Sequence, residues 1–377
     1  MAVPQEHRWP CAQCGAQLRY APGQTSLTCD HCGHVQAIPA TAPQSRALQE
    51  LDLAQGLGDD LPKADMVDVR TTSCPSCGAL VEIEGATHAT ECPFCATPVV
   101  LDTGTQRLIK PQGVVPFALT EAQARAAMTG WMGSLWFAPN TLLEYARKGR
   151  ALNGIYVPYW TFDADTASRY TGQRGEHYYE TRTVTVQVNG KSQQRQEQVR
   201  KTRWYSASGD VTRDFDNVLV IASHSLPNRL ADALEPWELG ALTPYSPEFL
   251  AGFQAEGYTV ALADGHGLAR SRMAQVIEGD VRRDIGGDEQ RVTSVNTSWS
   301  EETFKHILLP VWMAAYKYNG KSFRFLVNGQ TGEVQGERPW SIWKIAFAVV
   351  VVAAIVAGAI YVIGPENLGF AAETLNF

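Results

Sequence analysis

The sequence predicts an α+β protein with two N-terminal zinc ribbons, a β-rich mixed domain with a few helices, and one C-terminal transmembrane helix. All eight cysteines lie before residue 96 as four Cys-x-x-Cys pairs, and the middle of the chain alternates apolar and polar residues around Asn-Gly turns. Residues 345–363 form a run of 19 residues without a charge. With 377 residues, 45% of them hydrophobic, the chain is long enough for two or three compact units.

The cysteine pairs form an internal repeat, because a shift of 63 residues maps the first two pairs onto the last two. Each copy has 14 residues between its two pairs. The predicted ligands are Cys11, Cys14, Cys29 and Cys32 in the first copy and Cys74, Cys77, Cys92 and Cys95 in the second. Four thiolates suit tetrahedral Zn²⁺ and leave no open coordination position, so we expect two structural zinc ions. An iron–sulfur centre or redox-active pairs are the alternatives, although a redox Cys-x-x-Cys usually stands alone at a helix start.

The first ten residues, MAVPQEHRWP, contain no apolar secretion signal, so we expect a cytoplasmic N-terminus in which thiols stay reduced. The ribbons are predicted at 1–39 and 71–104, and the Ala-, Pro-, Gln- and Asp-rich segment 40–70 is predicted to link them. Each ribbon is too small for a core of its own, so metal binding should supply its folding energy.

Residues 105–340 should form the β-rich α+β domain. Thr120 with Gln123 makes a capping box before one predicted helix, and Asn140 can cap a second. Asn-Gly pairs at 189–190 and 319–320 predict two hairpins, and further helical segments are expected at 227–234 and 267–281.

The predicted transmembrane helix covers residues 341–363, because its apolar run is close to the thickness of a bilayer core. Arg338 and Lys344 precede the run, whereas the tail 364–377 has two acidic residues and no Lys or Arg. The positive-inside rule then predicts a single-pass protein of the cytoplasmic (inner) membrane with a short extracytoplasmic tail. Ala354-x-x-x-Gly358 is compatible with a homo-oligomer.

Charge and motifs argue against nucleic-acid binding and catalysis. The net charge is −7, and residues 1–105 carry 5 basic and 12 acidic side chains, which disfavours phosphate-backbone binding. Gly-Lys-Ser occurs at 190–192 and 320–322, but Thr185 and Ala315 stand where a Walker A loop requires glycine. No Ser, His and acid spacing marks a hydrolase. We therefore predict no enzyme and no catalytic residues, with a site assembled in space in the Trp-rich domain as the alternative.

Several segments carry a family resemblance: the Cys-x-x-Cys ribbons, 154–163 (GIYVPYWTFD), 170–175 (YTGQRG), 309–312 (LPVW) and 325–339 (FLVNGQTGEVQGERP). Together they resemble bacterial membrane proteins with transcription-factor-IIB-type zinc ribbons. Such proteins often carry the label primosomal protein N′ (replication factor Y) superfamily II helicase, which the missing Walker A loop contradicts here. The resemblance implies partners such as phage-shock-protein-A-like membrane-remodelling proteins, and it transfers only the eight cysteines as site residues.

The function predicted from these observations is a non-enzymatic zinc-ribbon membrane anchor or adaptor. It would recruit protein partners at the cytoplasmic face of the inner membrane, in envelope stress or membrane remodelling as the resemblance implies. The alternative is a nucleic-acid-binding zinc-ribbon protein linked to replication or transcription, against which the acidic N-terminal part weighs.

Overall fold

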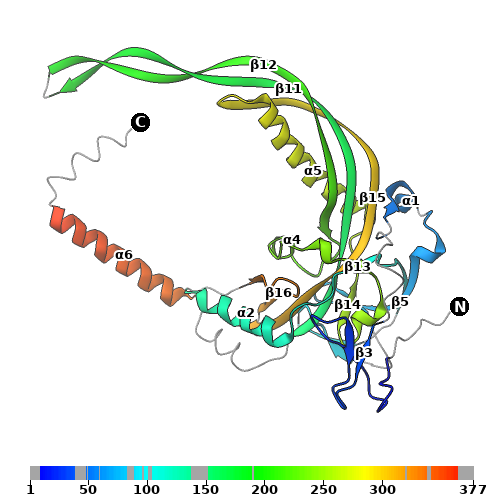
Figure 1. Cartoon of the computed structure of the whole chain (residues 1–377). Coiled ribbons are helices and arrows are strands. Elements are labelled where there is room, and N and C mark those ends of the chain that lie inside the picture. The colour runs from blue at the N-terminus through cyan, green and yellow to red at the C-terminus, as the bar shows by residue number, and fades with distance from the viewer. Residues whose placement is uncertain are drawn as a thin grey trace.

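The computed structural model describes residues 9–363 apart from 39–47, 49, 59, 83–88, 96, 101–103, 137–151, 189–190, 319–320 and 338–340. Three very long strands dominate it: β11 (Asn153–Val188), β12 (Lys191–Ile221) and β15 (Glu289–Tyr318), of 36, 31 and 30 residues. β11 lies between the other two and pairs antiparallel with both. The three strands bend together into an arch (Figure 1).

Nine shorter strands complete a twelve-stranded sheet in the described part of the chain. They are β4 (Leu51–Asp52), β5 (Met66–Ser73), β6 (Leu80–Glu82), β9 (Gly104–Ile109), β10 (Gly113–Val114), β13 (Thr243–Pro244), β14 (Gln254–Gly257), β16 (Lys321–Asn328) and β17 (Val334–Gly336). A separate three-stranded sheet contains β1 (Arg19–Tyr20), β2 (Ser26–Thr28) and β3 (Val35–Ala37), and a two-stranded one contains β7 (Ala89–Glu91) and β8 (Pro98–Val100).

The helices are α1 (Leu53–Leu57), α2 (Glu121–Ser134), α4 (Asn228–Asp232), α5 (Leu262–Ile285) and α6 (Ile342–Ile363), with 3₁₀ turns at Lys63–Asp65, Leu239–Ala241 and Pro247–Leu250. The capping box predicted at α2 is confirmed, since Thr120 and Gln123 cap each other reciprocally. The helix predicted after Asn140 lies outside the described residues. The segment assigned to a linker contains β4, α1 and the start of β5.

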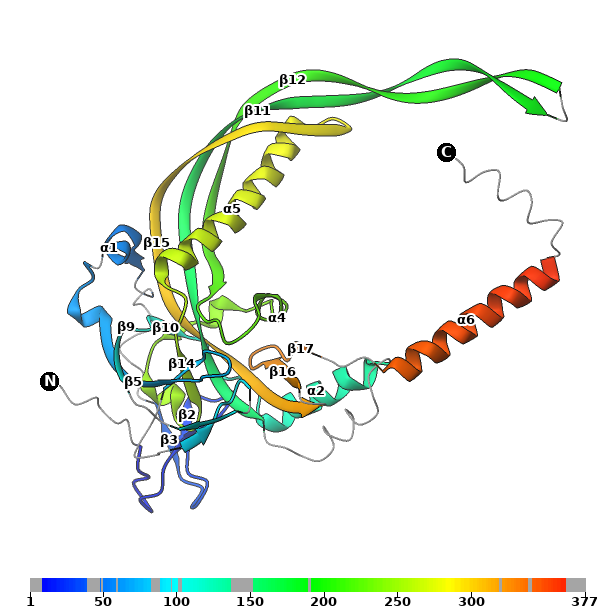
Figure 2. The same ribbon diagram turned by 180° about the vertical axis from the view of Figure 1, so that it is seen from behind.

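Helix α5 lies along the concave side of the arch in both views (Figures 1 and 2). Its buried side chains recur at helical spacing, at Ala269, Met273, Ile277, Val281 and Ile285, and they pack against the inner face of the long strands. The helix therefore fills the concave side along part of the arch and supports the curvature of the strands there.

The predicted C-terminal transmembrane helix, and with it the single-pass inner-membrane localisation, is wrong. The described part of the chain contains no helix that combines the length and the apolar character needed to cross a membrane. The fold is therefore two cysteine ribbons on a β-rich body, with α6 as a C-terminal helix.

Candidate metal centres

The eight predicted ligands lie in two groups of four, and the sulfur atoms of each group all lie within 4.8 Å of one another. In the first group, Sγ of Cys11 is 3.6 Å from Sγ of Cys32, and Sγ of Cys14 is 3.5 Å from Sγ of Cys29. A tetrahedral zinc ion with Zn–S bonds of about 2.3 Å places its sulfurs about 3.8 Å apart. These four side chains therefore fit a tetrahedral ion.

The second group has the same geometry. Sγ of Cys74 lies 3.6 Å from Sγ of Cys95, and Sγ of Cys77 lies 3.7 Å from Sγ of Cys92. None of the eight cysteines forms a disulfide in the structure. Each Cys₄ group could thus hold one zinc ion, with all four positions filled by protein and the ion confined to a structural role.

The local backbone explains why each pair of cysteines converges. In three of the four turns a glycine with φ of +73° follows the second cysteine, at Gly15, Gly33 and Gly78. This backbone conformation is unfavourable for any residue that has a Cβ. The N–H of Gly15 donates to the carbonyl of Cys11 over 2.9 Å, and Gly33 and Gly78 repeat this bond to Cys29 and Cys74. Ala96 occupies the corresponding position of the fourth turn.

Hydrogen bonds within the clusters alter the thiol pKa values. The backbone N–H of Cys32 lowers the pKa of Cys29 to about 6, and the hydrogen bond with the Cys92 side chain lowers the pKa of Cys77 to about 5. That same bond, followed by burial, raises the pKa of Cys92. Metal binding requires all four thiolates, so loading a site releases protons.

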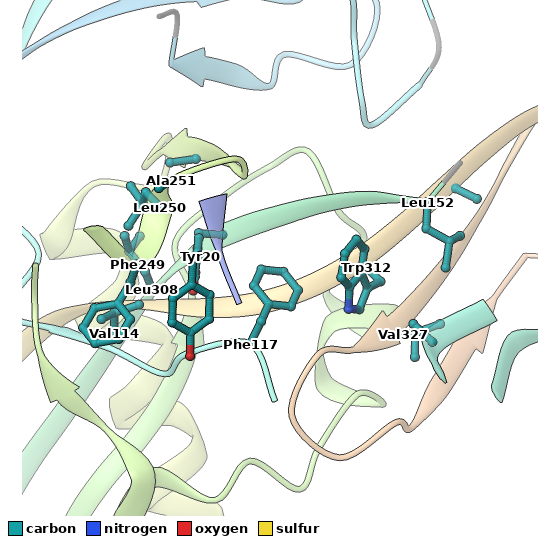
Figure 3. Close-up of a cluster of buried hydrophobic side chains, with 14 of the residues drawn as sticks. Tyr20, Val114, Phe117, Leu152, Phe249, Leu250, Ala251, Leu308, Trp312 and Val327 are labelled. Atoms are coloured by element: carbon teal, nitrogen blue, oxygen red, sulfur yellow. The ribbon is translucent and has the colours of Figure 1, made fainter. Parts of the chain in front are cut away.

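The first ribbon is packed against the body of the protein. Leu18, Tyr20 and Leu27 are at most 4% exposed and belong to the same buried cluster as Phe117 and Phe249. Figure 3 shows Tyr20 of β1 among residues that come from distant parts of the chain. Its backbone N–H also donates to the carbonyl of Ala251 over 2.9 Å. The ribbon is therefore held in a fixed position by the core.

The second ribbon is joined to the body through the sheet itself. Its strand β6 pairs antiparallel with β14, with Val81 opposite Glu256. Val81 and Phe94 are buried in the cluster that contains Ile155 and Leu309 of the long strands. Each ribbon thus packs into a hydrophobic cluster that it shares with the long strands, the first ribbon into one cluster and the second ribbon into another.

The histidines near the ribbons do not join the metal groups. His31 and His34 lie outside both sets of four, and His88 lies outside the described residues. The other sites considered from sequence, the two Gly-Lys-Ser segments, belong to hairpins: Val188 pairs with Lys191, and Tyr318 with Lys321. Both hairpin predictions are confirmed.

A buried carboxyl group lies beside the second ribbon and was not predicted from the sequence. Glu256 of β14 is 1% exposed, and Oγ of Ser223 donates to its Oε1 over 2.6 Å. Burial raises the pKa of Glu256 to about 8, so the side chain is neutral at pH 7. A lone Glu in a short strand carries no sequence signal. Because the group is sealed from solvent, it is not placed to meet a substrate.

Comparisons with known proteins place the chain beside one of unassigned function. The uncharacterized protein YdjG of Bacillus subtilis (strain 168) is 26% identical over 345 residues, which cover 90% of this chain and 92% of YdjG. No family model matches the chain, and no solved structure matches it. The helicase label therefore gains no support, and what stands of the resemblance is the pair of cysteine tetrads that fit zinc ribbons.

Proposed function

We propose that the protein is a non-enzymatic adaptor that binds protein partners through its zinc ribbons. The observation that carries this proposal is the pair of complete Cys₄ groups, each packed against a hydrophobic cluster of the body. A filled coordination sphere leaves a metal ion no position for a water or a substrate. The metal then shapes a surface, and the body of the protein holds that surface in place.

The outer strand of the first ribbon supplies such a surface. All three residues of β3 are exposed, and β3 pairs with β2 along one edge in the described sheet. Val35 is 55% exposed, unusual for an apolar side chain within a strand. Edge strands with exposed apolar side chains are frequent docking places for extended segments of other proteins.

The charge of this ribbon favours a protein partner over nucleic acid. Residues 9–38 contain one basic and one acidic side chain, Arg19 and Asp30, which form an ion pair of 3.1 Å. A zinc ion bound by four thiolates carries a net charge of about −2. Nucleic-acid affinity depends on positive charge, so this surface suits a neutral or basic protein. The family resemblance adds phage-shock-protein-A-like proteins as the first partners to test.

A matched pair of substitutions tests the proposal. The full-length chain is purified from its native cell in mild conditions after nuclease treatment, and co-eluting proteins are identified by mass spectrometry. Val35→Asp changes the exposed strand of the ribbon, whereas Val276→Asp makes the same change on the exposed face of α5, where Val276 is 43% exposed. We expect a stoichiometric protein to be lost with Val35→Asp and kept with Val276→Asp.

Two results would contradict the adaptor proposal. One is a partner retained by both variants, which removes the ribbon from the interface. The other is nucleic-acid machinery that co-purifies when nuclease is left out and disappears when it is added, together with binding to DNA or RNA that weakens steeply with salt. That second result would favour the nucleic-acid-binding alternative.

A further inference from the structure

The hairpin of β11 and β12 extends beyond the end of β15, the third strand of the arch. β15 begins at Glu289, which pairs with Gly175, whereas β11 and β12 stay paired up to Val188 and Lys191. We call residues 176–188 of β11 and 191–203 of β12 the arm; it projects from the arch as a two-stranded ribbon (Figure 2). Two strands alone are marginally stable in water, and a third or fourth strand stabilises them.

The two open edges of the arm differ in charge. The β12 edge carries the basic residues Lys191, Arg195, Arg200, Lys201 and Arg203 and the acidic Glu197, and such charges protect an edge strand from pairing with other chains. The β11 edge has no charge from Thr183 to Val188, and it is rich in β-branched residues with no Gly or Pro. That composition favours strand pairing. One edge is therefore protected and the other is not.

Backbone direction shows that the β11 edge is ready to pair. Asp288, just before β15, donates its N–H to the carbonyl of Gly175 over 2.9 Å, and its carboxylate accepts from the N–H of His177 over 2.7 Å. The odd-numbered residues of β11 thus turn their backbone groups to the β15 side. Because this direction alternates along a strand, residues 179, 181, 183 and 185 present N–H and C=O groups along the open edge.

We propose that the β11 edge of the arm pairs antiparallel with the same edge of a second copy of the chain, so that two arms form a four-stranded sheet. Registers centred closer to Gly175 would make the second copy overlap β15, which begins opposite Gly175. A register centred on Thr183 avoids this overlap. It places Thr183 opposite Thr183 and Thr181 opposite Thr185, and threonine pairs across strands are stabilising. The contact is symmetric, as expected for a two-fold dimer.

The charges of the β11 edge are compatible with a second copy as the occupant. In this register Glu180 faces Val186 and Arg182 faces Val184, so no like charges stand directly opposite each other. Glu180 also pairs with Lys201 on the neighbouring strand of its own arm. The β12 edge carries six charged residues in the arm, which makes it less suited to strand pairing than the β11 edge. The proposal concerns self-association and is independent of ribbon binding.

Proline substitutions on the two edges give a matched test. Thr183 and Gln196 face each other across the arm, and both turn their N–H groups away from the partner strand of the hairpin. Thr183→Pro therefore removes a donor from the β11 edge, and Gln196→Pro removes one from the β12 edge, with the hairpin bonds kept. Sedimentation velocity of the full-length protein over a concentration series measures the dimer dissociation constant.

We expect a concentration-dependent dimer whose dissociation constant rises at least tenfold with Thr183→Pro and stays unchanged with Gln196→Pro. Thr183→Lys and Gln196→Lys provide a second pair if either proline variant melts early; Thr183→Lys places two lysines face to face and should weaken the dimer, less so at high salt. A wild-type monomer at every concentration overturns the proposal, even if an extended strand of another protein binds the edge. Equal losses from both edges also overturn it.

Discussion

Tyr20 of the first ribbon packs edge-on against Phe249 of the body, with 5.4 Å between the ring centroids. The tyrosine is 4% exposed, and burial raises its pKa to about 12. The two residues are far apart in sequence, so their contact packs the N-terminal ribbon against the body of the protein. The stability of the ribbon and that of the body are therefore coupled.

Truncating this contact should destabilise the whole protein. We expect Tyr20→Ala to lower the free energy of unfolding by about 3 to 5 kcal/mol, as for other buried aromatic residues cut to alanine. Urea unfolding followed by fluorescence measures the change. Val35→Ala, on the exposed strand β3, is the control and should change stability by less than about 0.5 kcal/mol. A ribbon that unfolds alone, without lowering the body's stability, would contradict this coupling.

The metal content should follow the cysteine groups. We expect two zinc ions per chain by elemental analysis of the purified protein, and one after Cys92→Ser, because three thiolates hold zinc much less firmly than four. His34→Ala, close to the first group but outside it, should keep two ions. A Cys92→Ser variant that still binds two zinc ions would show that Cys92 is not a ligand.

Two glycines of α5 should respond in opposite directions to alanine. A Cβ at Gly265 would lie 2.6 Å from Cδ1 of Trp160, whose indole N–H is held by the carbonyl of Val260 at 3.1 Å. Gly279 has open space around it. We expect Gly265→Ala to destabilise by about 1 to 3 kcal/mol. Gly279→Ala should stabilise by about 0.5 to 1 kcal/mol, because alanine favours the helix. Thermal melting of both variants would decide; equal shifts would contradict the close approach.

Local chemistry made the metal groups predictable from sequence. The spacing of Cys11 to Cys32 repeats at Cys74 to Cys95, and a Cys-x-x-Cys turn brings its two sulfurs together without help from the rest of the fold. The Asn-Gly hairpins and the Thr120 cap are equally local signals, and the structure confirms them. The docking of the ribbons was not predictable, because Tyr20 and Phe249 meet only through tertiary packing.

The length of the long strands was also not predictable from the sequence, and Gly172 shows the reason. Glycine within a strand normally indicates a break, but here the register shifts between Thr171 and Gly172 while the strand continues. A Cβ at Gly172 would collide with the carbonyl of Arg291 and the side chain of Ile285. The glycine thus permits the close packing of α5 and β15 on β11 rather than ending β11.

The buried carboxyl of Glu256 should make stability depend on pH. Its folded pKa of about 8 lies above the ordinary value of 4.5, so between these values the folded protein keeps a proton that the unfolded chain releases. Stability should therefore fall as pH rises from 6 to 8, with a slope of up to about 1.4 kcal/mol per pH unit. Glu256→Gln keeps the acceptor for Ser223 and removes the titrating proton, so its slope should be flatter.

Urea unfolding of the metal-loaded protein at several values between pH 6 and 8.5 measures this slope. Glu278→Gln is the matched control, because Glu278 lies on α5 with its side chain 48% exposed, and its slope should equal that of the wild type. If Glu256→Gln and the wild type lose stability in parallel, the pH dependence belongs to other groups, with the cysteine thiolates as the first to examine. A flat Glu256→Gln profile with higher stability at pH 8 would establish that the fold holds this carboxyl neutral.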